Sequence, residues 1–241
     1  MNNEVFLSIL ENGSIENVKN MCNTNKHFKS LCNNYQYQIQ KHFLKKYHVD
    51  YTNPGCLIYL YDDSYKEMEE REFVKHAFKL FLTFYKKKEI QCDSKKITSI
   101  PILPNLEILH CQNNLLTSLP ILPNLLMLNC DDNQLTSIPL LPNLNDLSCS
   151  FNQLKFIPLL PQLKFLTCSF NLLSFIPLLP QLTYLICSFN EIKFIPVLPQ
   201  LSILRCENNQ ITTIPILPEL TFLYCKNNQI TIIPNLPKIE S

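Results

Sequence analysis

The sequence predicts an α+β protein in which a helical N-terminal domain, residues 1–88, precedes a repeat solenoid over residues 89–241. The solenoid is expected to carry a parallel sheet on one side and an extended, polyproline-like convex side. The composition predicts this first: 17 prolines and 11 cysteines accompany only 2 glycines among 241 residues. The spacing predicts it second, because from residue 92 onward cysteines and prolines recur every 19 residues. An apolar content of 46% is typical of a globular chain.

The repeat reads L-x-x-L-x-C-x-x-N-x-L-x-x-I-P-x-L-P-x, and about eight copies follow one another without a gap. Leucine and cysteine alternate with variable residues, which predicts a short half-buried strand with leucine and cysteine facing inward. One such coil cannot bury its apolar face alone, so the coils are expected to stack. The cysteines that define the period are Cys92, Cys111, Cys130, Cys149, Cys168, Cys187, Cys206 and Cys225.

Asparagine and proline are predicted to shape the rest of each coil. An asparagine side chain both donates and accepts hydrogen bonds, so it can satisfy backbone groups at a buried turn. Proline lacks an N–H and pushes the preceding residue out of the helical region, so the I-P-x-L-P segment should be extended. The first coil has Lys95 instead of the asparagine, and the later coils have Asn114, Asn133, Asn152, Asn171, Asn190, Asn209 and Asn228.

This pattern resembles that of leucine-rich repeats over about residues 87–240, and the short P-x-L-P form is similar to the repeats of bacterial effector proteins. A period of 19 lies just below the usual range, which implies thin coils without convex-side helices. Such effectors often carry a ligase domain after the repeats, and the sequence up to Ser241 gives no reason to carry that activity over.

The cysteines are expected to be core thiols. No C-x-x-C spacing is present, and a row of inward thiols does not form a tetrahedral metal site. The chain lacks a basic n-region followed by an apolar core at its start, so we expect a reducing, cytoplasmic location (host cytoplasm for a viral protein), with thiols in place of disulfides. The P-x-x-P runs are expected to be architectural, and the alternative is a ligand for SH3-type domains.

Variable positions around the strands are the candidate binding residues. Aromatic residues clustered on one face of a solenoid suit a protein partner. Three phenylalanines, each two residues after a cysteine, either join this face or fill the coil interior. The predicted protein-binding residues are His110, Asn129, Asp131, Phe165, Thr167, Tyr184, Ile186, Arg205, Phe222 and Tyr224, with the phenylalanines Phe151, Phe170 and Phe189.

The N-terminal region has helical periodicity. Phe73, Ala77, Leu80, Phe81 and Phe84 recur at steps of three and four residues, which predicts a helix over about residues 64–87 with lysines at its C-terminal end. Any solenoid needs its first coil covered, so these helices are expected at least to cap it.

Three segments near the start carry a second resemblance. Residues 4–10, 15–18 and 21–32 resemble the F-box, a helical module that docks the adaptor of cullin-type ubiquitin ligases, although the usual Leu-Pro start is absent. The resemblance implies an adaptor-binding role for Leu7, Leu10, Ile15 and Val18. The asparagine- and isoleucine-rich composition is also similar to that of repeat proteins of giant DNA viruses.

Together these features predict a non-catalytic protein-interaction scaffold, either an F-box-like substrate receptor or a plain binding module whose helices only cap the solenoid. No residues stand in an arrangement that argues for catalysis, a metal or a cofactor. Residues 1–91 have a net charge of +2 and residues 92–241 one of −1, so no basic stripe predicts nucleic-acid binding. No apolar run is long enough for a membrane span. An open last strand predicts edge-to-edge dimerisation.

Overall fold

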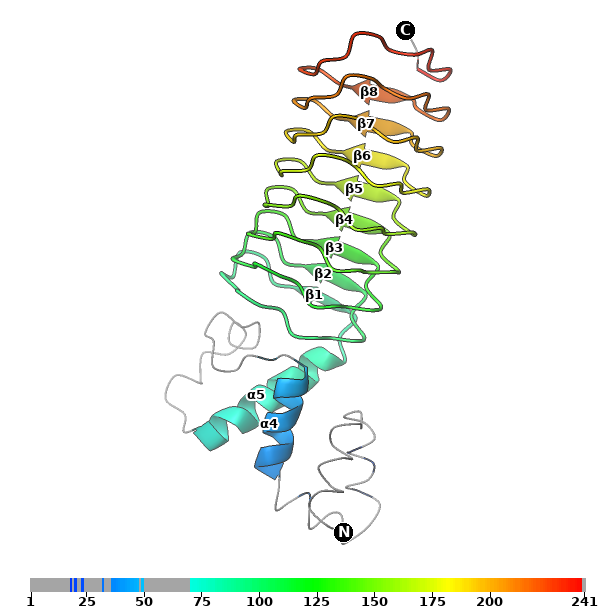
Figure 1. Cartoon of the computed structure of the whole chain (residues 1–241). Coiled ribbons are helices and arrows are strands. Elements are labelled where there is room, and N and C mark those ends of the chain that lie inside the picture. Colours follow the sequence, from blue (N-terminus) through cyan, green and yellow to red (C-terminus); the bar gives the residue numbers. More distant parts are fainter. Residues whose placement is uncertain are drawn as a thin grey trace. The chain divides into compact units, whose positions relative to one another are not determined.

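The computed structural model describes residues 18, 20, 23, 32, 36–47, 49 and 70–239. The chain divides into two compact units, residues 1–84 and 85–241 (Figure 1). The first unit ends at residue 84, four residues before the boundary that the sequence predicts after residue 88. Each unit is described by itself below.

In the first unit, two helices pack through aromatic side chains. Helix α4 spans Gln36–Lys46 and helix α5 spans Glu70–Tyr85. The rings of Phe43 and Phe78 stack with centroids 6.2 Å apart, and those of Tyr47 and Phe81 lie 5.3 Å apart. Helix α5 ends at Tyr85, so the three lysines 86–88 directly follow its C-terminal end.

The second unit is a parallel β-solenoid, as predicted. Its sheet has eight strands in sequence order, each of three residues, stacked along the solenoid (Figure 1). Every residue of strands β1 to β7 pairs with the residue 19 positions later, for example Leu109 with Leu128. The strands are β1 Glu89–Gln91, β2 Ile108–His110, β3 Met127–Asn129, β4 Asp146–Ser148, β5 Phe165–Thr167, β6 Tyr184–Ile186, β7 Ile203–Arg205 and β8 Phe222–Tyr224.

The core of the solenoid consists of columns of identical residues. The middle residue of every strand from β1 to β7 is buried, and so is the cysteine that follows that strand. The core also includes the leucines or isoleucines two residues after each buried asparagine, the leucine of each P-x-L-P segment, and leucines two residues after such a segment, for example Leu106 and Leu125. Between the strands, residues 92–221 contain no helix, as predicted for the proline segments.

The seven repeat asparagines, called here the asparagine ladder, join neighbouring coils. The Oδ1 atom of Asn171 accepts a hydrogen bond from the Leu154 amide at 2.9 Å, and its Nδ2 atom donates to the Cys149 carbonyl of the previous coil at 2.9 Å. The same Nδ2 atom also donates to the carbonyls of Cys168 and Ser169 in its own coil. The predicted role of asparagine is therefore confirmed, and it extends to the first coil, where Lys95 donates its amide hydrogen to Asn114.

The eight repeat cysteines are free thiols, and all but Cys225 are buried. Burial raises their pKa values, to about 12 for Cys92 and Cys206, so they remain protonated and unreactive at neutral pH. This agrees with thiols that fill the core. In the first unit, however, Cys32 is disulfide-bonded, so the expectation of thiols throughout the chain is wrong there.

Candidate protein-binding face

The strand face is the side of the solenoid formed by the first and third residues of each strand, together with the first two residues after each cysteine. In β2 to β6 the middle residue is buried while its two neighbours are half-buried or exposed. The structure places all thirteen predicted binding residues at exposed or half-buried positions of this face. For the residues within the strands this exposure is as the alternation predicted, and the role of all thirteen in binding stays a prediction.

A polar network covers the face at coils two to five. The hydroxyl of Ser148 donates to Asp131 Oδ2 at 2.6 Å and lies 2.6 Å from the Thr167 hydroxyl. Asn129 donates through Nδ2 to Gln112 Oε1 and accepts from the Asp131 amide. These bonds run along the stack from one coil to the next, so the predicted residues Asn129, Asp131 and Thr167 form one connected surface.

Two carboxyl groups of this surface ionise less readily than usual. Burial raises the pKa of Asp131, although hydrogen bonds from Ser148 and the Ser150 amide act in the opposite direction. Burial also raises the pKa of Asp146, against the favourable charge of His110. Because both folded-state pKa values lie above the unfolded ones, the stability that these groups contribute is present at low pH. It is lost as the pH rises through the raised values.

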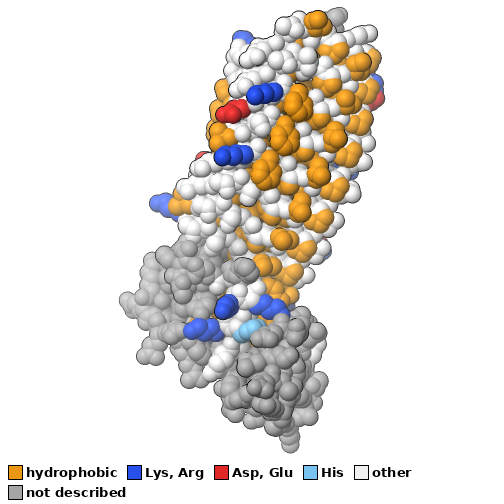
Figure 2. Space-filling model, viewed as in Figure 1, with side chains coloured by type: hydrophobic (Ala, Val, Ile, Leu, Met, Phe, Trp, Pro, Cys, Tyr) orange, Lys and Arg blue, Asp and Glu red, His pale blue; other side chains and the backbone are white. Residues whose placement is uncertain are grey.

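Phe151, Phe170 and Phe189, called here the phenylalanine ladder, are exposed by 52%, 41% and 45%. They stack on one another with ring centroids 4.4 and 4.2 Å apart and interplanar angles of 10°. Of the two alternatives that the sequence left open, the structure therefore shows exposure; the rings do not fill the coil interior. Hydrophobic side chains lie in rows along the stacked coils (Figure 2).

The backbone at the ladder is unusual. Its three phenylalanines have φ angles of 54 to 56°, in the left-handed region. Such a conformation disfavours bulky residues, at about 1–2 kcal/mol each, whereas asparagine and aspartate tolerate it. Other coils indeed have Asn113, Asp132, Asn208 and Asn227 at this position, with the same φ. Three exposed phenylalanines thus stand where the fold itself favours short polar residues.

The residues directly after the cysteines are less exposed than the alternation predicted. Ser169 and Ser188 are buried, and Asp131 and Glu207 are half-buried. Strand alternation predicts that the residue after each inward-facing cysteine faces solvent, and this prediction is wrong for the two serines. The physical reason is that the chain turns into the left-handed conformation at the next residue, which ends the strand-like alternation after the cysteine.

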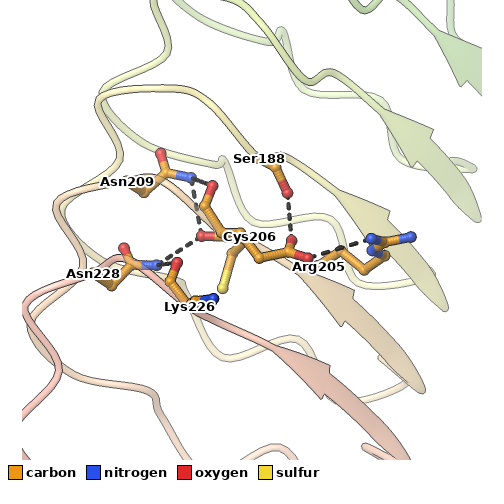
Figure 3. A network of polar contacts seen from close by, with 7 residues as sticks. Ser188, Arg205, Cys206, Asn209, Lys226 and Asn228 are labelled. Atoms are coloured by element: carbon orange, nitrogen blue, oxygen red, sulfur yellow. Dashed lines mark hydrogen bonds and ion pairs between the residues drawn. The ribbon is translucent and has the colours of Figure 1, made fainter.

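Charged residues gather on the face at the last two strands. Arg205 forms an ion pair with Glu207 at 3.3 Å and lies 5.0 Å from the centroid of the Tyr224 ring. Glu207 also accepts a hydrogen bond from the Ser188 hydroxyl (Figure 3). Burial alone would raise the pKa of Glu207, but the hydrogen bonds from Ser188, its own backbone and Arg205 outweigh burial and lower it. Glu207 is therefore a fixed anion between two coils.

An open pocket of about 360 Å³ lies beside these charges. Among its lining residues, sequence reasoning had selected only Phe170, Phe189, Ile186 and Arg205. The two asparagines of the lining occupy the same turn position as the phenylalanine ladder, and that shared spacing was the signal that could have identified them. The lining residues missing from the prediction are Ser169, Ser188, Glu207, Asn208, Lys226 and Asn227.

One family model matches part of the solenoid. The model of "Leucine Rich repeats (2 copies)" matches residues 180–219, which hold strands β6 and β7 with their asparagine and proline segments. These two coils are similar to leucine-rich repeats. Coils two to five have the same buried columns as the matched coils and the same asparagine hydrogen bonds to the preceding coil, for example from Asn133 and Asn171. Comparison with curated proteins finds no match to the chain.

Solved structures of leucine-rich repeat proteins share the fold. YopM from Yersinia enterocolitica is 29% identical with a TM-score of 0.57, covering 65% of this chain and 41% of its own. YopM from Yersinia pestis, a leucine-rich effector protein, is 26% identical with a TM-score of 0.61, covering 82% and 63%. The repeat domain of a Shigella effector is 27% identical with a TM-score of 0.58, covering 71% and 84%. The chain thus spans less than two thirds of either YopM.

The F-box-like residues, metal sites and membrane helices can be assessed only for the residues that the structure describes. Leu7, Leu10 and Ile15 lie outside the described residues, whereas Val18 is described and buried. Within the described ranges no three histidine, cysteine or acidic side chains form a group that could hold a metal ion. In the same ranges no helix has the length and apolar character needed to cross a bilayer.

Proposed function

We propose that this protein is a binding module that captures a protein partner on the strand face of its leucine-rich repeats. The observation that carries the proposal is the phenylalanine ladder, because three exposed rings occupy a turn position that disfavours them. Clustered exposed aromatic residues are typical of energetically dominant interface residues. The likeness to effector repeat proteins of Yersinia and Shigella supports a protein target, and leucine-rich repeat solenoids are generally binding modules, not enzymes.

The test replaces the ladder with the residue that other coils use at the same φ. The triple variant Phe151→Asn, Phe170→Asn, Phe189→Asn should stay folded, because asparagine occupies this turn at Asn113 and Asn208. We expect proteins captured by the immobilised full chain from a eukaryotic lysate to fall by about tenfold or more, measured by quantitative mass spectrometry.

The matched control removes apolar side chains that are more exposed than the ladder and lie elsewhere in these coils. Leu159, Leu178 and Val197 lie in the proline segments and are exposed by 65%, 65% and 58%. Their joint replacement by asparagine should leave capture unchanged. Equal capture by the ladder variant and the wild type would show that the strand face is not the binding surface.

The role of the N-terminal helices is a separate part of the proposal. The F-box resemblance supports recruitment of a ubiquitin-ligase adaptor through Leu7, Leu10, Ile15 and Val18, whereas the alternative is that the helices only cap the solenoid. Burial of Val18 leaves little of that side chain for an adaptor. Co-purification of the adaptor with the full chain, lost on Leu7→Asp and Leu10→Asp, supports the first role. An empty pull-down with a strand-face partner still bound supports the second. Action in the cytoplasm and a viral origin stay predictions from the sequence.

Edge-to-edge dimerisation through β8 also stays a prediction. In the described sheet β8 pairs only with β7, and Ile232 and Ile233 of the same coil are exposed. An unpaired strand edge with apolar neighbours favours pairing with a second copy. Light scattering at high protein concentration should then give twice the chain mass, and a monomer mass at every concentration would contradict it.

A further inference from the structure

The phenylalanine ladder stops abruptly at one coil, and the pocket begins there. Phe189 stacks on Phe170, and among the described residues no ring stacks on its other side. In the next coil the same turn position holds Asn208, which has the same left-handed φ. The Asn208 side chain instead accepts a hydrogen bond from Asn227 at 2.8 Å. The pocket of about 360 Å³ is lined by both phenylalanines and by both asparagines, so it lies where a fourth ring would continue the stack.

The polar side of this pocket has groups that could still form a hydrogen bond or an ion pair with a ligand. The Ser169 hydroxyl is buried in the pocket wall without a hydrogen-bond partner, although such groups are nearly always paired. Arg205 and Glu207 neutralise each other. Lys226 is exposed and forms no ion pair with the described residues, so the charged lining has a net charge of +1.

We propose that this pocket, the ladder-end pocket, binds an aromatic side chain of the partner polypeptide next to a carboxylate side chain. The aromatic ring stacks on Phe189 as the fourth member of the ladder, and the carboxylate pairs with Lys226. The inference rests on the proposed protein-binding function and names the chemistry of the segment that is recognised. The pocket volume falls within the range of about 300–1,000 Å³ that is typical of sites for small groups.

A polypeptide is favoured over a single-stranded nucleic acid, which also stacks on aromatic residues. Nucleic-acid grooves are lined by several uncompensated basic residues, whereas this face also carries Glu207, Asp131 and Asp146. One free lysine suits one carboxylate better than a chain of phosphates.

The probes are the blocked dipeptides N-acetyl-Asp-Phe-amide and N-acetyl-Asn-Phe-amide, titrated into the full chain and followed by NMR. We expect saturable shifts at Phe189 and Lys226, with the Asp-Phe peptide binding about two- to fivefold more tightly, as for a partly exposed ion pair. Lys226→Gln should make the two peptides equal. No saturable shift, or equal binding of both peptides by the wild type, would overturn the proposal, as would tighter binding of tetrathymidylate at the same residues.

The variant Asn208→Phe fills the pocket with the protein's own fourth ring. It should fold, because three coils already carry phenylalanine at this φ, and it should abolish the peptide shifts. Asn113→Phe introduces the same residue at the same turn far along the stack, and should leave the shifts intact. Unchanged binding by Asn208→Phe would contradict the assignment. If Asn208→Phe does not fold, the Lys226→Gln comparison still decides it.

This test is independent of the natural partner. Asn208→Phe could lose peptide binding but still capture proteins from the lysate, while the triple ladder variant fails to capture them. This result would limit the pocket's role to part of the interface. Failure of the peptide test with intact ladder-dependent capture would refute the ladder-end pocket alone. Failure of capture with successful peptide binding would refute only the wider proposal.

Discussion

Asn171→Ala should lower the free energy of unfolding by about 1–3 kcal/mol, because that is the cost of leaving a buried polar group such as the Leu154 amide unpaired. Asn171 is buried and makes four hydrogen bonds to the backbone of two coils. Alanine would leave the buried Leu154 amide without its partner, whereas the Cys149 carbonyl would keep its hydrogen bond from Asn152. Urea denaturation followed by circular dichroism measures the loss.

Asn143→Ala is the matched control for the asparagine ladder. Asn143 also bridges two coils, donating through Nδ2 to the Pro123 carbonyl at 2.9 Å, but the bond is exposed to water. Water can replace it, so we expect a loss below about 0.5 kcal/mol, as for ordinary surface substitutions. Similar losses for the two variants would contradict the view that burial makes the ladder essential.

Leu166→Ala should destabilise the solenoid by about 2–5 kcal/mol, since it removes a fully buried side chain and leaves a cavity. Leu166 is the middle residue of β5 and is 0% exposed, between Leu147 and Leu185 of the adjacent strands. Unfolding by heat or urea should show the loss. Because each coil contacts only its neighbours, partial unfolding at the centre of the stack is expected to accompany it.

The adjacent residue provides the control for Leu166→Ala. Phe165 is the larger side chain, but it is 47% exposed and its ring lies 6.3 Å from that of Tyr184 on the strand face. Phe165→Ala should therefore cost less than about 1 kcal/mol, although it removes more atoms. A larger loss for Phe165→Ala than for Leu166→Ala would contradict the assignment of the two faces of β5.

The solenoid could be predicted from sequence because the same pattern of core, turn and proline residues recurs seven or eight times. One leucine or one cysteine is ambiguous, but a column of them every 19 residues permits only a stack in register. Helix α4 was missed for the opposite reason. It occurs once, and its apolar residues Ile39, Phe43 and Leu44 stand among glutamines and lysines that blur the helical period.

The candidate site could be predicted only in part. Exposure of the strand-face residues follows from alternation, so residues such as Phe165 and Arg205 were found. Exposure of the phenylalanine ladder depends on a left-handed turn that sequence alone leaves undecided, since phenylalanine is not a residue expected there. The ladder-end pocket depends on the size difference between Phe189 and Asn208 at equivalent positions, a contrast that has meaning only once the turn geometry is known.

The turn after each strand has a consequence for the unfolded chain. Proteins usually form left-handed turns with glycine, which is flexible when unfolded and loses much freedom on folding. Here serine, asparagine, aspartate and phenylalanine adopt this conformation, and the sequence of residues 70–239 contains no glycine. With 17 prolines also restricting φ, the unfolded chain has fewer conformations to lose. The restricted unfolded state thus lowers the conformational entropy lost on folding, which offsets the small core of a 19-residue coil.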